Sequence, residues 1–276
     1  MEKRNTMVRK NGSIPVVLTI AGSDSGGGAG IQADLKTFSA FGVFGTTAIT
    51  CLTAQNPDRV RGIQPAAPRM VDSQIRAVCE GFTVAAVKTG MLYSAGIIRA
   101  AARAVRRHRL PHLVVDPVMV ATSGAVLLRR DALHALARDL LPLATVITPN
   151  IPEAELLTDR EIHSVLDMKI AAEGIGRRFG VACVVKGGHL GGADLVNVLY
   201  FDSGAMIEFR HRRVQLPGRT ATHGTGCTFS AAIAAGLALG LDLPAAVRRA
   251  GGFVARAVAG AVRAGRHRPL NLRIRA

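Results

Sequence analysis

Apolar residues recur along the chain with two different periods. Short runs of β-branched and other apolar residues, as expected of buried strands, alternate with longer stretches whose apolar positions repeat at helical spacing. The strands expected from these runs cover 16–22, 46–54, 85–90, 112–118, 145–150 and 182–188. Strands that are apolar on both faces and alternate with helices are typical of a mostly parallel sheet covered on both sides. The pattern therefore predicts an α/β fold.

The helical stretches complete this alternation. They cover 31–42, 71–82, 95–108, 131–141, 165–179, 225–239 and 244–264. Residues 195–216 instead have the period of strands, and Asp-Ser-Gly at 202–204 predicts the turn of an antiparallel hairpin at an edge of the sheet. Because no repeat or change of composition divides the chain, we expect one domain over 14–264, a disordered basic extension at 1–13 and a tail at 265–276.

The net charge of +16 comes mainly from 29 arginines. A basic surface favours nucleic-acid binding, but these arginines alternate with alanines at helical spacing, and only 4% of the residues are aromatic. Such a pattern is typical of solvated helix faces, so we expect no nucleic-acid partner. A basic protein also suits a small anionic substrate, because a positive field concentrates such ligands.

The four cysteines and the N-terminal segment bear on the cellular compartment. The cysteines, at 51, 79, 183 and 227, do not have the spacing of a metal site. The apolar run that follows the basic start is short and ends at Asp24, unlike a signal peptide or a membrane-spanning helix. We therefore expect a cytoplasmic protein with reduced thiols and no membrane partner.

Polar residues and glycines gather where the predicted strands end. In an open parallel sheet, ligands bind beyond the carboxyl ends of the strands. Six strand ends carry chemically active or glycine-rich segments, at 22–30, 54–56, 88–91, 116–119, 148–153 and 186–189. A purely structural chain does not need such residues at the same end of six strands. The coincidence predicts an active site at that edge of the sheet.

Four of these residues are candidates for phosphate or metal binding. Asp116 and Glu153 have the carboxylates that Mg²⁺ prefers, although Asp116 could cap a loop and Glu153 could be a first-turn helix acid. Asn150 and Lys186 are candidate ligands of ATP phosphates, because a lysine that ends an apolar strand is costly unless it faces an anion.

Two flexible segments accompany these candidates. The glycine-rich segment 22–30 resembles a phosphate loop but lacks the spacing of a P-loop, so a flexible turn is equally consistent with it. The small polar segment 121–124 is typical of a mobile flap over a site.

Residues 222–236 predict a helix that begins with an anion hole. Gly224, Thr225 and Gly226 place consecutive backbone N–H groups at the helix start. Cys227 follows in the first turn, where the helix dipole favours the thiolate, so we expect a reactive thiol with a depressed pKa. The alternative is a buried, inert cysteine.

Six segments together closely resemble the hydroxymethylpyrimidine/phosphomethylpyrimidine kinases of thiamin biosynthesis, which belong to the ribokinase-like superfamily. The segments are 19–56, 88–92, 116–119, 148–157, 184–189 and 222–236. The resemblance implies a three-layer α/β/α domain that phosphorylates 4-amino-5-hydroxymethyl-2-methylpyrimidine with ATP and Mg²⁺, and then phosphorylates the monophosphate to the diphosphate. It also implies a homodimer.

The resemblance assigns roles to individual residues. By position, Asp34 and Gln55 would bind the amino group and ring nitrogens of the pyrimidine. The ring pocket would be lined by Gly22, Met91 and Val118. Cys227 would take the place of the catalytic base, and the metal would be held through Asp116 and Glu153.

The chain departs from the family pattern at two positions, and other functions remain open. Arg268 precedes Pro269 where relatives carry glycine, and Gly26 stands where many carry serine. The enzymatic alternative is a pyridoxal kinase. A non-catalytic regulator that binds the pyrimidine phosphate is a further alternative, which the presence of Gly226 and Cys227 disfavours.

Overall fold

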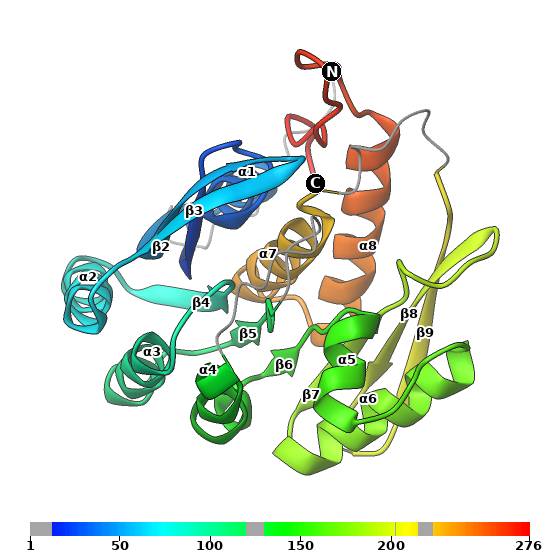
Figure 1. Ribbon diagram of the computed structural model, residues 1–276, viewed down its shortest axis with the longest axis horizontal. Coiled ribbons are helices and arrows are strands. Elements are labelled where there is room, and N and C mark those ends of the chain that lie inside the picture. The colour runs from blue at the N-terminus through cyan, green and yellow to red at the C-terminus, as the bar shows by residue number, and fades with distance from the viewer. Residues whose placement is uncertain (1–12, 120–129, 202, 215–222) are drawn as a thin grey trace.

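The described strands form one mixed sheet. The computed structural model describes residues 13–119, 130–201, 203–214 and 223–276, so the predicted flap and nearly all of the predicted N-terminal extension lie outside the described residues. The strands are β1 (Val16–Asp24), β2 (Phe44–Asn56), β3 (Arg59–Pro65), β4 (Val84–Thr89), β5 (Leu113–Val115), β6 (Val146–Ile147), β7 (Ala182–Lys186), β8 (Asp194–Tyr200) and β9 (Met206–Arg212). Their order across the sheet is β3-β2-β1-β4-β5-β6-β7-β8-β9 (Figure 1).

Helices cover both faces of this sheet. They are α1 (Gly30–Phe41), α2 (Pro68–Gly81), α3 (Ala95–Arg107), α4 (Arg130–Ala135), α5 (Ile151–Thr158), α6 (Val165–Phe179), α7 (Thr225–Ala238) and α8 (Leu243–Ala259). One core packs α1, α7 and α8 on one face, and a second core packs α2 to α6 on the other (Figure 1). The predicted three-layer α/β/α fold is confirmed.

The six central strands are parallel, and both edges of the sheet are antiparallel. Strands β2, β1, β4, β5, β6 and β7 pair in parallel. The predicted hairpin is present as β8 and β9. A second antiparallel pair, between β2 and β3, was not predicted. Segment 59–65 is charged and ends in proline, as is typical of an edge strand. Its sequence therefore lacks the alternation of apolar and polar residues by which strands are predicted.

Two of the predicted strands are shorter in the structure. The strands expected at 112–118 and 145–150 are β5 and β6, which contain 3 and 2 residues. Pro117 and Pro149 follow them and have no N–H group to continue the ladder. The polar residues that follow these short strands, Asp116 and Asn150 among them, therefore lie at the carboxyl edge of the sheet.

One predicted helix changes its type along its length, and another ends early. The helix expected over 131–141 consists of α4, a π-helical turn at Leu136–Leu140 and a 3₁₀ turn at Leu141–Leu143, which contains a proline at its start. The helix expected over 244–264 ends at Ala259, and Gly260 follows as its C-cap.

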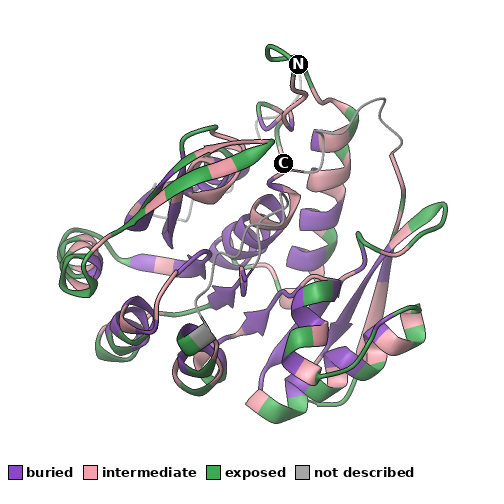
Figure 2. Cartoon of the chain, in the orientation of Figure 1, coloured by how far each residue is buried: buried purple, intermediate pink, exposed green. Residues whose placement is uncertain are grey.

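Helix α7 lies at the centre of the helical layer that it forms with α1 and α8. It packs on β1, β4 and β5 and lies between α1 and α8. Every residue from Thr228 to Ala238 is buried, so the helix is almost entirely purple in Figure 2. Because α7 is held on all sides, its first turn has a fixed place at the carboxyl edge of the sheet. In the part of the chain that the structure describes, every helix is too short or too polar to cross a lipid bilayer.

The C-terminal tail packs on the same layer. Leu270 and Leu272 are buried in the core beside α8. The Asn271 N–H donates to the Ala257 carbonyl, and the Ala276 N–H donates to the Ala40 carbonyl. The tail therefore anchors α8 and α1 to each other.

Candidate active site

Helix α7 begins at the carboxyl edge of the sheet with Gly224 as its N-cap. Gly224 has a φ of 84°, and no side chain caps the start of the helix. The first hydrogen bond of the helix runs from the Thr228 N–H to the Gly224 carbonyl. The first turn thus presents the positive end of the helix dipole. This geometry suits the anion hole predicted at Gly224, Thr225 and Gly226, and the binding of an anion there stays a prediction.

The glycine-rich segment lies directly against this helix start. A Cβ atom on Gly224 would overlap the carbonyl oxygen of Gly28, and a Cβ on Gly28 would lie 2.7 Å from the His223 ring. Because the backbone of Gly224 touches that of Gly28, glycine is required at 224, whereas a side chain at 28 would displace the His223 ring. The contact joins two segments that lie about 200 residues apart in the sequence.

Asp24 organises the glycine-rich segment from within. Its carboxylate accepts hydrogen bonds from the amides of Gly26, Gly28 and Ala29 at 2.8, 3.1 and 2.8 Å. The Nε2 atom of His223 lies 3.0 Å from the same carboxylate. Burial raises the pKa of Asp24, but these hydrogen bonds outweigh burial and hold the pKa below its ordinary value. The segment is therefore a structured turn whose amides face Asp24, which agrees with the turn interpretation rather than with an open phosphate loop.

Lys186 and Asp116 form a buried ion pair at the ends of β7 and β5. Lys186 Nζ lies 2.8 Å from Asp116 Oδ1, and the two side chains are 13% and 3% exposed. The same ammonium lies 3.3 Å from the position that a Cβ on Gly226 would take. It therefore reaches the first turn of α7. The anion that Lys186 meets in this structure is Asp116, and the predicted contact with ATP phosphates stays a prediction.

Asn150 and Glu153 form a capping box at the start of α5. The Glu153 N–H donates to Asn150 Oδ1 at 2.9 Å, and the Asn150 N–H donates to Glu153 Oε2 at 2.8 Å. Burial raises the pKa of Glu153 to about 7; Lys186 opposes this rise, and Asp116 adds to it. Glu153 is thus a first-turn helix acid, which was the alternative to a metal ligand in the sequence analysis. It also interacts with both members of the Lys186–Asp116 pair.

Asp116 and Glu153 fit a weakly held divalent cation. Among the residues with described positions, no three His, Cys, Asp or Glu side chains are grouped to hold a metal ion by themselves. Mg²⁺ keeps several waters and binds proteins through one or two carboxylates together with substrate phosphates. Two buried carboxylates that repel each other, one with a raised pKa, supply such a donor set.

Cys227 lies half-buried in the first turn of α7, and its predicted depressed pKa is wrong. Burial raises the pKa of the thiol to about 11; Lys88 and the Gly30 amide oppose the rise, whereas Asp116 and Asp34 add to it. A helix dipole contributes about 0.3–1 kcal/mol, less than the 1.36 kcal/mol that corresponds to one pKa unit. Burial can change a pKa by several units, so burial decides the outcome.

Asp34 and Lys88 form a second ion pair, in the core of the protein. Lys88 Nζ lies 2.9 Å from both carboxylate oxygens of Asp34, and both side chains are fully buried. The Thr19 hydroxyl donates to the same carboxylate at 2.6 Å. In this structure Asp34 is thus occupied by protein donors, and the predicted contact with the pyrimidine stays a prediction.

The residues predicted to line the ring pocket lie together around a further cysteine. Cys51 Sγ lies 3.7 Å from Met91 Sδ, and Val118 packs on both side chains. A Cβ on Gly22 would lie 2.7 Å from the Cys51 sulfur and 3.4 Å from the Met91 sulfur. Gln55 lies four residues further along β2, where its side chain accepts a hydrogen bond from the Thr53 hydroxyl. The structure therefore gathers Gly22, Met91 and Val118 around one small apolar surface.

A comparison with known families identifies the family of the chain. The model of the phosphomethylpyrimidine kinase family matches residues 24–271. The chain belongs to this family. A hydroxymethylpyrimidine/phosphomethylpyrimidine kinase of Rhizobium meliloti is 48% identical over 249 residues, which are 90% of this chain and 92% of that protein. The matched region includes all of the site residues described above except Gly22 and Thr19, which lie just before it.

Solved structures of phosphomethylpyrimidine kinases and pyridoxal kinases have the same fold. An ADP complex of Bacillus subtilis pyridoxal kinase has a TM-score of 0.86 and 38% identity, and the match covers 94% of this chain and 97% of that one. A phosphomethylpyrimidine kinase of Clostridium difficile has a TM-score of 0.76 and 41% identity, with 87% and 97% coverage. The predicted ribokinase-like fold is confirmed.

Four residues of the candidate site were not predicted from the sequence. They are Asp24, Cys51, Lys88 and His223. Lys88 carried a usable signal, because it interrupts an apolar strand in the same way as Lys186. The partners of Asp24 and Lys88 lie 199 and 54 residues away, so only the fold reveals them.

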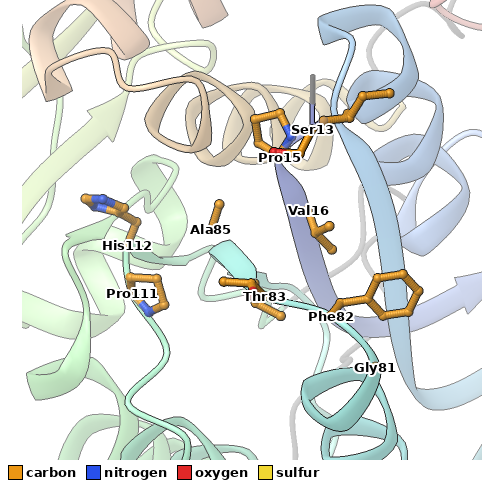
Figure 3. Close-up of a pocket in the computed structure, with 11 residues that line it drawn as sticks. Ser13, Pro15, Val16, Gly81, Phe82, Thr83, Ala85, Pro111 and His112 are labelled. Carbon is orange, nitrogen blue, oxygen red and sulfur yellow. The ribbon is translucent and has the colours of Figure 1, made fainter. Parts of the chain in front are cut away.

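A cavity of about 480 Å³ lies at the opposite, amino-terminal edge of the sheet (Figure 3). Its walls are formed by residues 13–16 at the start of β1, residues 81–85 at the start of β4, and residues 111–112 just before β5. None of the candidate site residues lines this cavity. The candidate site residues therefore lie apart from this cavity, at the carboxyl edge of the sheet.

We expect Cys227 to react slowly with iodoacetamide near neutral pH. With a pKa of about 11, only about one thiol in a thousand is ionised at pH 8, and the thiolate is the reactive form. Peptide mass spectrometry at a series of pH values measures the rate at this cysteine. The rate should rise about tenfold for each pH unit between 7 and 10. A plateau reached by pH 8 would show that the thiol is activated.

Proposed function

We infer that this chain uses ATP to phosphorylate 4-amino-5-hydroxymethyl-2-methylpyrimidine to its monophosphate, and then the monophosphate to the diphosphate, in the biosynthesis of thiamin (vitamin B1). One observation carries this inference. Within the region that matches the family, the start of α7, the Lys186–Asp116 pair and Glu153 converge at the carboxyl edge of the sheet. The name of the Rhizobium meliloti relative describes both phosphorylations.

The groups at this edge supply what phosphoryl transfer requires. The reaction needs in-line positioning of the reactants and neutralisation of the charge that spreads over the transferred group. We propose that the first turn of α7 binds the transferred phosphoryl group and that the Lys186 ammonium, which reaches Gly226, adds a positive charge to it. We also propose that Asn150, the N-cap of α5, binds the phosphates of ATP.

Asp116 and Glu153 are the residues that would hold Mg²⁺. A bound Mg²⁺ would neutralise the phosphates of ATP. At neutral pH the Glu153 carboxyl, with a pKa of about 7, loses its proton readily when a cation approaches. Lys186 donates a hydrogen bond to Asp116 Oδ1 and so orients this carboxylate.

Cys227 is placed at the acceptor end of the site. Because its pKa is about 11, the resting side chain is a neutral thiol. A loose transition state requires little help from a base before the bond to phosphorus breaks. We propose that the thiol hydrogen-bonds to the acceptor oxygen and that its ionisation is not needed before transfer begins.

The ring pocket fits a small, flat and weakly polar ring. Gly22, Met91 and Val118 surround the buried Cys51 and provide an apolar surface. We propose that Gln55, near the end of β2, is a partner of the polar ring atoms. The predicted contact between Asp34 and the ring stays a prediction, because Lys88 holds both oxygens of this buried carboxylate. Small apolar pockets with a few polar groups are typical of sites for such ligands.

Pyridoxal is the second candidate substrate, because the Bacillus subtilis structure to which this fold is similar is a pyridoxal kinase. The test compares kcat/KM for the pyrimidine alcohol and for pyridoxal with the same purified chain, ATP and Mg²⁺, and a control contains EDTA. We expect the pyrimidine to be preferred and EDTA to abolish turnover. A higher kcat/KM for pyridoxal would reassign the chain.

The remaining expectations concern the setting of the reaction. Because it consumes ATP, we place the enzyme in the cytoplasm with a small molecule as its partner. The homodimer implied by the resemblance stays a prediction, which light scattering on the purified chain measures directly.

A further inference from the structure

Lys88 is a fully buried lysine at the carboxyl end of β4. Its side chain is 0% exposed, and burying an ammonium in a protein core is unfavourable unless a partner compensates for lost hydration. Its Nζ atom lies 2.8 Å from the position that a Cβ on Gly90 would take. The ammonium is therefore directed along the strand toward the edge of the sheet that carries the active site, and the absence of a side chain at Gly90 leaves room for it.

Asp34 holds this ammonium in place from α1. Both of its oxygens lie 2.9 Å from Lys88 Nζ, and the Thr19 hydroxyl donates to Oδ2. An ammonium has three protons to donate, and the two contacts with Asp34 fix its orientation. The pair is thus a rigid element. It is more deeply buried than the Lys186–Asp116 pair, the other described ion pair of the site.

Lys88 and Cys227 belong to the same face of the sheet. Side chains alternate along a strand, so Lys88 points to the side of Ala86, and Ala86 and Cys227 pack in the same core, which contains α1 and α7. The charged groups that face Cys227 come from four elements: Asp34 from α1, Lys88 from β4, Asp116 after β5 and Lys186 from β7. Both ion pairs therefore interact electrostatically with the thiol.

We propose that Lys88 is a positioning residue for the acceptor site: its ammonium, oriented by Asp34, favours negative charge at Cys227 and at the acceptor oxygen beside it. In this arrangement Asp34 acts through Lys88 as its counterion. The proposal deepens the proposed function and rests on it for the identity of the acceptor. The effect of the Lys88–Asp34 pair on the charge at Cys227 does not depend on that identity.

The proposal predicts opposite effects for the two partners. Asp34→Asn removes a negative charge and keeps the cation, so it should lower the pKa of Cys227. Lys88→Met removes the cation, so it should raise that pKa. Charges at this range change a pKa by about one or more. A structural role alone would not produce changes of opposite sign.

The experiment measures alkylation of Cys227 by iodoacetamide in the full chain as a function of pH, with peptide mass spectrometry. For Asp34→Asn at pH 8 we expect alkylation about threefold faster, because a tenfold larger thiolate fraction is partly offset by lower nucleophilicity. For Lys88→Met we expect it to be slower by a similar factor. Cys79 in α2, in the core on the other face of the sheet, is the internal control and should not change.

A third variant keeps the test decisive if Lys88→Met does not fold. Lys88→Met/Asp34→Asn removes both charges together, and it should react more slowly than Asp34→Asn alone. Equal rates in these two chains, or an unchanged rate in Asp34→Asn, would overturn the proposal. A kinase assay of the unmodified chain is scored separately, so a failure to phosphorylate the pyrimidine would reject the proposed function and leave the thiol result in place.

Discussion

Gly224→Ala is expected to lower kcat by about a hundredfold or more, the loss that follows removal of a backbone anion site. An alanine side chain at this position would overlap the Gly28 carbonyl, so the start of α7 and the glycine-rich segment could not keep their present contact. The first-turn amides would then move away from the phosphoryl group. Steady-state kinetics with ATP and the pyrimidine alcohol measure this loss.

Gly240→Ala is the matched control. Gly240 has a φ of 87°, close to the 84° of Gly224, but a Cβ there would meet nothing within 4 Å. Both variants therefore carry the cost of a left-handed alanine, about 1–2 kcal/mol of unfolding free energy, and only Gly224→Ala carries the clash. We expect Gly240→Ala to keep the wild-type kcat. Equal loss of activity in both variants would show that strain in the backbone, and not the anion site, is responsible.

Lys186→Met is expected to lower kcat by about 10²–10³, because it removes a preorganised positive charge from the place where transition-state charge develops. The ammonium lies close to Asp116 and to the first turn of α7, so no other described side chain at that turn replaces it in this role. Activity within a few-fold of the wild type would contradict the assignment. Single-turnover measurements separate the chemical step from product release.

Two controls separate catalysis from stability in this experiment. Lys169→Met breaks a partly exposed pair with Glu208, and such pairs contribute at most about 1 kcal/mol, so its kcat should not change. Lys186→Met leaves Asp116 buried without a counterion, at a cost of about 3–5 kcal/mol. Lys186→Met/Asp116→Asn removes both charges and should recover stability in thermal unfolding without recovering activity.

The layers of the fold could be predicted from the sequence because each layer has its own period. Buried parallel strands and the helices between them have different spacings of apolar residues, and the hairpin at β8 and β9 has a turn with glycine. Strand β3 has no such period, because at the edge of the sheet most of its residues face solvent. The lengths of β5 and β6 depend on the prolines that follow them, which the hydrophobic pattern ignores.

The candidate site could be predicted only as a set of strand ends. The sequence identifies Lys186 as a lysine in need of an anion, but it does not show that this anion is Asp116, 70 residues away. The same holds for Lys88 and Asp34. For Cys227, the local helix start predicts a lower pKa, whereas the surrounding protein, which removes water from the thiol, raises it. Pairing and burial are properties of the folded chain.

The time course of products tests the central claim most directly. The purified chain is incubated with the pyrimidine alcohol, ATP and Mg²⁺, and mass spectrometry follows the phosphorylated products. We predict that the monophosphate appears first and the diphosphate second, in the wild type and in Gly240→Ala, and that Gly224→Ala forms neither in the same time. No phosphorylation of the pyrimidine by a wild-type chain that turns over pyridoxal, or wild-type product formation by Gly224→Ala, would contradict the account.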